Sequence, residues 1–353
     1  LWMTALLLLS AGVARAQNTE APKVLKRSVL IEAEPDRDWV GRGRMLERRD
    51  GTWLYLYVHG NHHSARDRTK RVHLRFSTDE GRTWTEEDRL PGGDAVRGMP
   101  IVPGKDMEHG EVGLVQCPNG DLLAFIRRIR KPKKWLGERM VRSTDGGRSW
   151  KQEGVVQNTN ILHGLDLCSV GDVILAPFRI KKGKYCRLIL LASEDNGRTW
   201  QQRSVFAERK DRVNETGIVH LGDDRLMVVC RTFGEQSTMQ RYSSDLGRTW
   251  GPWRDITDQV DVVQQPRLRR YNRQPDRIYL FGRNRYKEYV QRNGLWWSDD
   301  GGRTWDGFDL DEKDFRDSGY GDALFREDGA MVYLAYRGRD ERADLIQIGR
   351  AHV

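Results

Sequence analysis

Arginines dominate the side chains that we expect to gather at one site of this 353-residue chain, where they are accompanied by a few carboxylates and one tyrosine. Lys and Arg number 60 against 51 Asp and Glu, which gives a formal net charge of +9. Guanidinium groups form charge-assisted and often bidentate hydrogen bonds with carboxylates and phosphates. The side chains that we expect to gather at one face include Arg42, Arg44, Asp67, Glu215, Arg231, Arg283, Arg285, Arg292, Tyr320 and Arg337. Their types predict a pocket for an anionic ligand, equipped with carboxylates and a hydroxyl.

Five copies of one octapeptide indicate the framework that must position these side chains. The pattern is S-x-D-x-G-x-[ST]-W, and the copies span Ser77–Trp84, Ser143–Trp150, Ser193–Trp200, Ser243–Trp250 and Ser298–Trp305. Their central Asp residues lie 66, 50, 50 and 55 residues apart. A period near 50 made of short strands is typical of a β-propeller with one blade per repeat. Within each copy we expect Asp to accept hydrogen bonds from backbone N–H groups, Gly to adopt a positive φ, and Trp to pack beneath the turn.

Strands can be predicted around each octapeptide. The segment before it forms the third strand of a blade, and an upstream hairpin with Asp, Asn or Gly in its turn forms the first two. A sixth hairpin without an octapeptide covers residues 321–336, with another third strand at 344–348. Residues 28–31 are expected to supply the outer strand that closes the ring. We predict an all-β fold, a six-bladed β-propeller of four-stranded antiparallel blades, as a single domain over residues 17–353.

The ends of the sequence and its composition narrow the class of protein. An apolar run followed by Ala14-Arg15-Ala16 predicts a signal peptide at residues 1–16, and hence a secreted or periplasmic protein. No later stretch is long enough for a membrane-spanning helix, so no stable membrane insertion is expected. Basic runs interleaved with aromatic residues are lacking, which argues against nucleic acid as a partner. The cysteines have no paired spacing and are expected to be buried thiols; they are Cys117, Cys168, Cys186 and Cys230.

The octapeptides and the candidate site together resemble the exo-α-sialidases (neuraminidases), six-bladed propellers with Asp-box (BNR) repeats. The resemblance covers roughly residues 28–350. Tyr320, in GYGDALFREDGAMVYLAY, is similar to the nucleophile of that family. Glu215, in NETGIVHLGDDRLMVVCR, is similar to the base that serves the tyrosine, and Arg231 at the end of this segment is similar to the second of three arginines that bind the substrate carboxylate. The resemblance implies a retaining glycoside hydrolase without a cofactor.

The other implied site residues match less of the family pattern. Arg42 would be the first arginine, but it lies in Gly-Arg-Gly-Arg rather than aromatic-Arg-Ile-Pro, and Arg44 could replace it. Arg292 would be the third arginine, with Arg283 and Arg285 as close competitors, and Asp67 would be the acid/base. Where the family often has a Glu after a strand ending in Tyr, this chain has Arg337. An extra arginine could serve a more highly charged sugar.

The implied reaction explains why these residue types would occur together. Sialic acid carries a carboxylate on its anomeric carbon, which repels a carboxylate nucleophile but not a neutral tyrosine hydroxyl. Glu215 would accept the proton of Tyr320, and arginines would stabilise the developing phenolate. Asp67 would protonate the leaving oxygen and then activate water.

Two other functions remain open on the sequence alone. The first is hydrolysis of another acidic sugar by the same fold, and the second is glycan binding without catalysis. Both keep sialylated or other acidic glycans as partners. A metal site at His59, His62 and His63 is not expected, because this loop lacks helical spacing and an evident carboxylate partner.

Overall fold

Strands make up nearly all the regular structure of the chain. The structure is a computed structural model. It describes residue 22 and residues 24–31, 39–61, 69–102, 107–130, 134–156, 161–163, 166–182, 185–232, 237–271, 274–287, 290–311, 317–339 and 342–350. Within these ranges lie 24 strands, one 3₁₀-helix (Arg209–Asp211) and one four-residue helix, α1 (Thr257–Val260).

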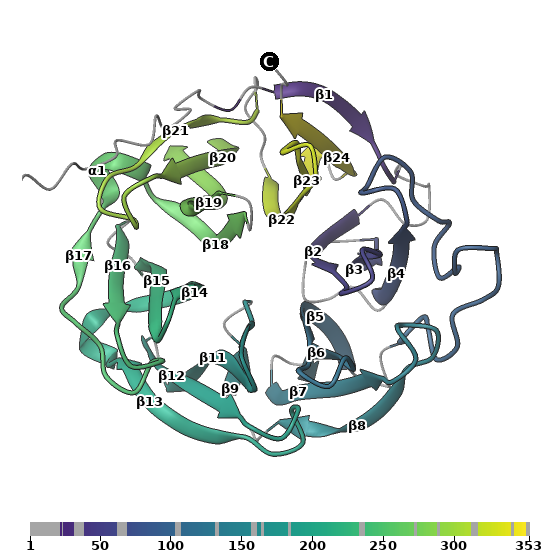
Figure 1. Cartoon of the computed structure of the whole chain (residues 1–353), viewed down its shortest axis with the longest axis horizontal. Helices are drawn as coiled ribbons and strands as arrows, with labels where there is room; N and C mark the ends of the chain where they lie inside the picture. The colour runs from purple at the N-terminus through teal and green to yellow at the C-terminus, as the bar shows by residue number, and fades with distance from the viewer. Residues whose placement is uncertain are drawn as a thin grey trace, which may run out of the picture.

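The strands form six antiparallel sheets arranged as a ring around a central axis (Figure 1). The first three sheets in chain order comprise β2 (Trp39–Glu47), β3 (Trp53–Gly60) and β4 (Arg71–Ser77); β5 (Met107–Gln116), β6 (Leu122–Arg130), β7 (Lys134–Ser143) and β8 (Lys151–Val156); and β9 (Ile161–His163), β10 (Cys168–Val170), β11 (Val173–Lys182), β12 (Tyr185–Ser193) and β13 (Gln201–Ala207). The other three comprise β14 (Val213–Gly222), β15 (Arg225–Thr232), β16 (Thr238–Ser243) and β17 (Arg254–Asp255); β18 (Val263–Tyr271), β19 (Gln274–Lys287), β20 (Val290–Ser298) and β21 (Asp306–Asp309); and β22 (Asp317–Phe325), β23 (Met331–Arg339) and β24 (Arg342–Arg350) with β1 (Val24–Val29). Hereafter the sheets are blades 1 to 6 in this order.

The predicted all-β propeller is confirmed, with differences in two blades. Five of the sheets have four or more strands, but blade 1 has three among the described residues. There an isolated bridge joins Val72 to Ile101 by two backbone hydrogen bonds of 3.1 Å, which continues the pairing at its outer edge. In blade 3 the inner position is divided between β9 and β10, which both pair with β11.

The two ends of the described chain meet in blade 6. The first strand, β1, pairs antiparallel with the last strand, β24, in a register that sets Val29 opposite Ile346. The sequence predicts this ring closure, but four residues too far along the chain at its start: the strand covers Val24–Val29 rather than residues 28–31. A propeller closed in this way leaves only short strand edges exposed.

The hydrophobic core is divided among the six interfaces between neighbouring blades. In β3, Leu54 and Leu56 pack against blade 2, whereas Tyr55 and Tyr57 pack against blade 6. Successive side chains of a strand point to opposite faces of its sheet, so these strands are apolar on both faces. Each blade is therefore buried only when both of its neighbours are present.

The octapeptides form the turns that the sequence predicts. In the fourth copy, Asp245 accepts hydrogen bonds from the Thr249 backbone N–H (2.9 Å), the Thr249 hydroxyl (2.6 Å) and the Ser243 hydroxyl (2.7 Å). Gly247 has a φ of 80°, in the left-handed region. The tryptophan of each copy packs into the interface with the preceding blade; they are Trp84, Trp150, Trp200, Trp250 and Trp305. The boxes therefore fasten neighbouring blades together.

All four cysteines are free thiols, and three of them are buried, as expected. Burial raises the pKa of the Cys168 and Cys230 thiols to about 12. In the described ranges no helix is long and apolar enough to cross a membrane.

The box aspartates should contribute stability that depends on pH. Burial opposes ionisation of Asp245, but the hydrogen bonds from Thr249 and Ser243 outweigh it and lower the pKa to about 2, from 3.8. A depressed carboxyl pKa stabilises the fold above the unfolded value, and this stability is lost as the pH falls toward the folded value. Asp245→Ala should therefore cost about 1–2 kcal/mol of unfolding free energy at pH 7, and less near pH 2. Chemical denaturation at both pH values, beside the exposed-site control Asp172→Ala, measures this. An equal loss of unfolding free energy in Asp245→Ala and Asp172→Ala would contradict this stabilising role of Asp245.

Candidate functional site

A β-bulge occurs at corresponding positions in five of the innermost strands. In each, three residue steps on the inner strand oppose two steps on its partner. The residues bracketing the shifts are Gly41 and Arg44 in β2, His109 and Val112 in β5, Val213 and Thr216 in β14, Gln264 and Arg267 in β18, and Gly319 and Asp322 in β22. Bulges re-aim side chains and are common beside active sites. The candidate residues Arg42, Glu215 and Tyr320 all lie within these bulges.

The sequence around Tyr320 is what its bulge requires. Tyr320 is 9% exposed and has a φ of 54°, which is unfavourable for a bulky side chain. The next residue, Gly321, lies so close to the Tyr333 ring that a Cβ atom would approach it to 2.3 Å. Blade 1 repeats this arrangement, because Arg42 has a φ of 56° and precedes Gly43. The strain is thus built into two blades in the same way.

Two guanidinium groups lie at the ring of Tyr320. The Arg42 Cζ atom is 5.4 Å from the ring centroid, and the Arg283 Cζ atom is 5.2 Å from it. These distances are typical of cation–π contacts. Arg44, the alternative to Arg42, is instead buried at 2% exposure and borders a separate cluster of charges. Arg42 is therefore the arginine of this pair that reaches the tyrosine.

Arg283, and not Arg292, is the blade 5 arginine in contact with Tyr320. Arg283 lies on the face of its sheet toward blade 6, where its Nε atom donates to the Gln264 side-chain oxygen at 3.1 Å. Arg292 lies on the other face of the sheet and forms an ion pair of 3.0 Å with Asp309. Sequence analysis gave Arg283 only as a competitor. The Arg285 side chain falls outside the described part of the chain.

Glu215 and Arg231 form the pair that the sequence predicts. The Arg231 Nη1 atom lies 3.4 Å from Glu215 Oε2, and Glu215 is buried whereas Arg231 is partly exposed. The same Glu215 oxygen accepts the backbone N–H of Gln265 at 2.8 Å. Glu215 is thus fixed to β18 of blade 5 as well as to its own blade.

These contacts form one continuous path across four blades. From Arg231 and Glu215 in blade 4 it passes to β18, whose Gln264 holds Arg283 against Tyr320 of blade 6, and ends at Arg42 of blade 1. Asp67, His62 and His63 lie outside the described residues, as do the side chains of Arg337 and His109. The path brings together one hydroxyl, one carboxylate and three arginines.

A buried cluster of charges, which sequence analysis missed, borders the same bulges. Arg269 donates to Asp166 at 3.0 Å and to Asp322 at 2.7 Å, and Asp322 also accepts the backbone N–H of Met45 at 3.0 Å. Burial raises the pKa of Asp166, although the charge of Arg269 opposes this. The cluster joins blades 1, 5 and 6 to the segment before β10. Its residues are far apart in sequence, so no local pattern marks them.

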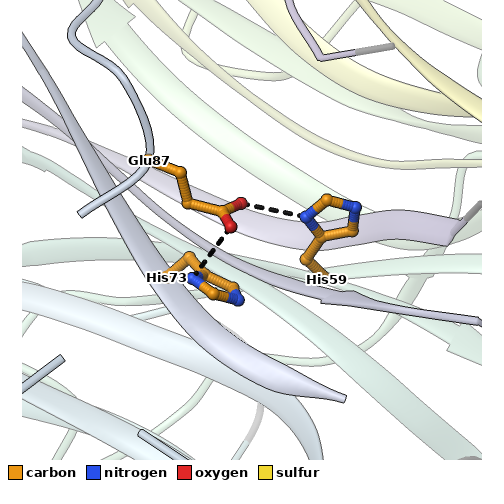
Figure 2. A group of neighbouring side chains, drawn as sticks. All are labelled: His59, His73 and Glu87. Atoms are coloured by element: carbon orange, nitrogen blue, oxygen red, sulfur yellow. Dashed lines mark hydrogen bonds and ion pairs between the residues drawn. The ribbon is translucent and has the colours of Figure 1, made fainter. Parts of the chain in front are cut away.

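A second polar cluster lies within blade 1 (Figure 2). Glu87 accepts from Tyr57 (2.7 Å), lies 2.9 Å from the Nδ1 atom of His59, and forms a 3.2 Å contact with the Nδ1 atom of His73. Asp88 also contacts this His73 atom, at 2.7 Å. Burial alone would raise the pKa of Glu87, but the hydrogen bond from His59 and the charge of His73 outweigh it and hold the pKa well below its usual range.

His59, His73 and Glu87 have the donor types that bind zinc, with ligand atoms within 4.8 Å of one another. A metal-bound histidine almost always donates its other ring N–H to an acceptor. The buried Nε2 atom of His73 has no partner among the described residues. Both Glu87 oxygens are already engaged at hydrogen-bond distances. The cluster therefore fits a hydrogen-bonded support for the ends of β3 and β4 better than it fits a metal centre.

The ring of antiparallel blades, the five boxes and the bulged inner strands define the class of protein: it has the sialidase-like propeller fold. The chain superimposes on the Trypanosoma rangeli sialidase in complex with 2,3-difluorosialic acid with a TM-score of 0.70 at 13% identity, covering 92% of this chain and 58% of that one. It also matches the Ruminococcus gnavus intramolecular trans-sialidase (TM-score 0.68, 12% identity, 92% and 97% covered). A protein of unknown function from Dyadobacter fermentans gives a TM-score of 0.75 at 16% identity, with 93% and 98% covered.

The family follows from the sequence itself. Residues 104–334, more than half of the chain, match the model of the BNR repeat-like domain, and the chain belongs to that family. Among curated proteins none matches the sequence.

Glu87 offers a test of the blade 1 cluster. Because its pKa is lowered, its carboxylate stabilises the fold above the ordinary value of 4.5, and this stabilisation is lost as the pH falls below that value. Glu87→Gln should lower the unfolding free energy at pH 7 by about 2 kcal/mol, with a smaller difference below pH 4. The neighbouring exposed residue provides the control Glu86→Gln. Urea denaturation across this pH range would refute the assignment if Glu87→Gln were as stable as the control at pH 7.

Proposed function

We propose that the protein is an exo-α-sialidase, a retaining glycoside hydrolase that releases terminal sialic acid from glycoconjugates. The observation that carries this proposal is Tyr320, held in a bulge with the guanidinium groups of Arg42 and Arg283 at its ring. A binding protein needs only the arginines for an anionic sugar. A buried tyrosine beside two cations favours a hydroxyl that loses its proton during the reaction.

Each residue then has a role in a two-step displacement. Tyr320 Oη attacks the anomeric carbon as the leaving oxygen receives a proton, and the proton of the tyrosine passes to Glu215. Arg42 and Arg283 stabilise the negative charge that develops on the phenolate. Asp67 is proposed as the acid that protonates the leaving oxygen and as the base that then activates water. When water attacks, the bond between Tyr320 and the anomeric carbon breaks, and the phenolate regains its proton from Glu215. Two displacements at one carbon retain its configuration.

The arginines would also hold the substrate carboxylate. Arg231 is partly exposed beside Glu215, and with Arg42 it is proposed to bind the carboxylate through charge-assisted hydrogen bonds. For the third position we propose Arg283 ahead of Arg292, because Arg292 is paired with Asp309. The net charge of +9 suits acidic glycans as partners, and residues 1–16 support a secreted or periplasmic location.

A second candidate is hydrolysis of another acidic sugar by the same residues. The observation that favours it is the altered arginine set, with Arg283 at the tyrosine and Arg292 turned to Asp309. A carboxylate placed elsewhere on a sugar ring would suit arginines placed differently. Uronic acid glycosides in the same assay as sialosides separate the two candidates.

Tyr320→Phe provides the direct test of the nucleophile. The substitution keeps the ring and removes the hydroxyl, so kcat on a fluorogenic sialoside should fall by roughly 1000-fold or more. Tyr271→Phe is the control, because Tyr271 is also buried and hydrogen-bonds to the backbone of a distant turn. Incubation with 2,3-difluorosialic acid should also add the sugar covalently to the Tyr320 peptide, as mass spectrometry would show. Normal turnover by Tyr320→Phe would overturn the proposal.

Arg283→Lys and Arg292→Lys distinguish the two blade 5 arginines. Lysine keeps the charge but loses the planar fork of donors, so the variant at the binding position should raise KM by about 10–100-fold. We expect this for Arg283→Lys and a smaller change for Arg292→Lys. Steady-state kinetics on the same sialoside measures the difference. A larger increase in KM for Arg292→Lys than for Arg283→Lys would indicate that Arg292, and not Arg283, binds the substrate.

A further inference from the structure

Gln265 occupies the bulge position in blade 5 that Arg42 occupies in blade 1 and Tyr320 in blade 6. Each is the first of the two residues between the bracketing positions of its inner strand. Their φ angles are 53°, 56° and 54°, all in the left-handed region. Residues with the same register and the same backbone conformation project their side chains in corresponding directions from their strands.

The backbone of Gln265 already belongs to the candidate site. Its N–H donates to Glu215 Oε2 at 2.8 Å, and the preceding residue, Gln264, holds Arg283. Strained backbone of this kind persists where the surrounding structure over-determines it, and it concentrates at functional sites. Gln265 thus lies between the proposed base and the arginine that contacts Tyr320.

The carboxamide of Gln265 has no hydrogen-bond partner in the described structure. The residue is 1% exposed, and neither its Oε1 nor its Nε2 atom forms a hydrogen bond with a described group. Buried polar groups are nearly always paired, because leaving one unpaired costs free energy. The side chain of the adjacent Gln264 is paired, because its oxygen accepts a hydrogen bond from Arg283. The unpaired amide therefore does not stabilise the free protein, which indicates another role for this side chain.

We propose that Gln265 contacts the ligand and that its carboxamide binds a neutral polar substituent of the sugar. This inference rests on the proposed function, since it concerns the same site. An amide offers one acceptor and two donors without charge, so it pairs with a hydroxyl or an N-acyl group, whereas the arginines bind the carboxylate. A site with unpaired polar groups rejects a ligand that lacks the matching group. Gln265 would thus determine which acidic sugar is accepted.

The first arm of the test measures the stability of the free protein. Gln265→Met keeps the length and flexibility of the side chain and removes the unpaired polar atoms. Its melting temperature should equal or exceed that of the wild type, because an apolar group replaces a buried amide without a partner. Gln264→Met is the matched control and should melt several degrees lower, because it removes the acceptor of Arg283. If the melting temperature of Gln265→Met falls as far as that of Gln264→Met, the proposal is overturned, whatever the protein hydrolyses.

The second arm measures recognition. Fluorogenic sialosides that each lack one neutral substituent are compared between the wild type and Gln265→Met. The wild type should lose roughly 10-fold or more in kcat/KM when one particular substituent is absent, and Gln265→Met should show no further loss for that same analogue. A variant that keeps the full discrimination of the wild type would refute the role of Gln265.

The two proposals can fail separately. If the wild type hydrolyses no sialoside, the proposed function fails. The wild type and Gln265→Met are then compared by the shift in melting temperature that glucuronic acid and its deoxy analogues cause. A shift that depends on one hydroxyl in the wild type and not in Gln265→Met supports the inference for that sugar. Equal dependence in the two proteins refutes it.

Discussion

The structure depends on one packing constraint: every sheet must be covered on both faces by another sheet. Strand β3 shows why, since its even-numbered leucines and its odd-numbered tyrosines are both buried, but against different neighbours. Sheets of this kind have no free face, so the chain adds blades until the last one meets the first. The pairing of β1 with β24 completes that ring. Convergence of the inner strands on one axis is then a consequence of burial, and the site is built where they converge.

The site uses the inner strands at the points where their regular pairing fails. A bulge changes the direction in which a side chain projects from its sheet, as at Arg42 and Tyr320, whose side chains contact each other. Beneath these bulges, Arg267 and Arg269 form ion pairs with Asp166 and Asp322, so these charges are paired within the protein. The guanidinium groups of Arg42 and Arg283 lie at the ring of Tyr320. The fold thus keeps this buried charge cluster apart from the arginines that contact the tyrosine.

Features encoded by residues close together in the sequence could be predicted, whereas contacts between distant residues could not. The boxes repeat within eight residues, so the propeller, its third strands and its closing strand were all predicted. The Glu215–Arg231 pair was also predicted, because both residues flank one hairpin. The choice between Arg283 and Arg292 could not be made from the sequence, because the contact with Tyr320 depends on the strand register that sets Arg283 opposite Asn293 and so on the face toward Tyr320. The contact between His59 and Glu87 crosses strands and leaves no local pattern. Gln265, in contrast, could have been found by aligning the first strands, where Arg42 and Tyr320 precede glycine and Gln265 precedes proline.

The repeated bulge has a consequence for the side chains that the inner strands present. Five of the inner strands have a bulge, and in three of them the first bulge residue, Arg42, Gln265 or Tyr320, has a left-handed backbone. The side chains at the first bulge positions differ in what they contact: Tyr320 belongs to a hydrophobic cluster, and Asn214 accepts a hydrogen bond from Arg179 of the neighbouring blade. Arginine, tyrosine, glutamine and, in the remaining two bulges, glycine and asparagine already occupy these five positions in a single chain. One backbone feature therefore carries five different side chains around the inner strands of a single ring.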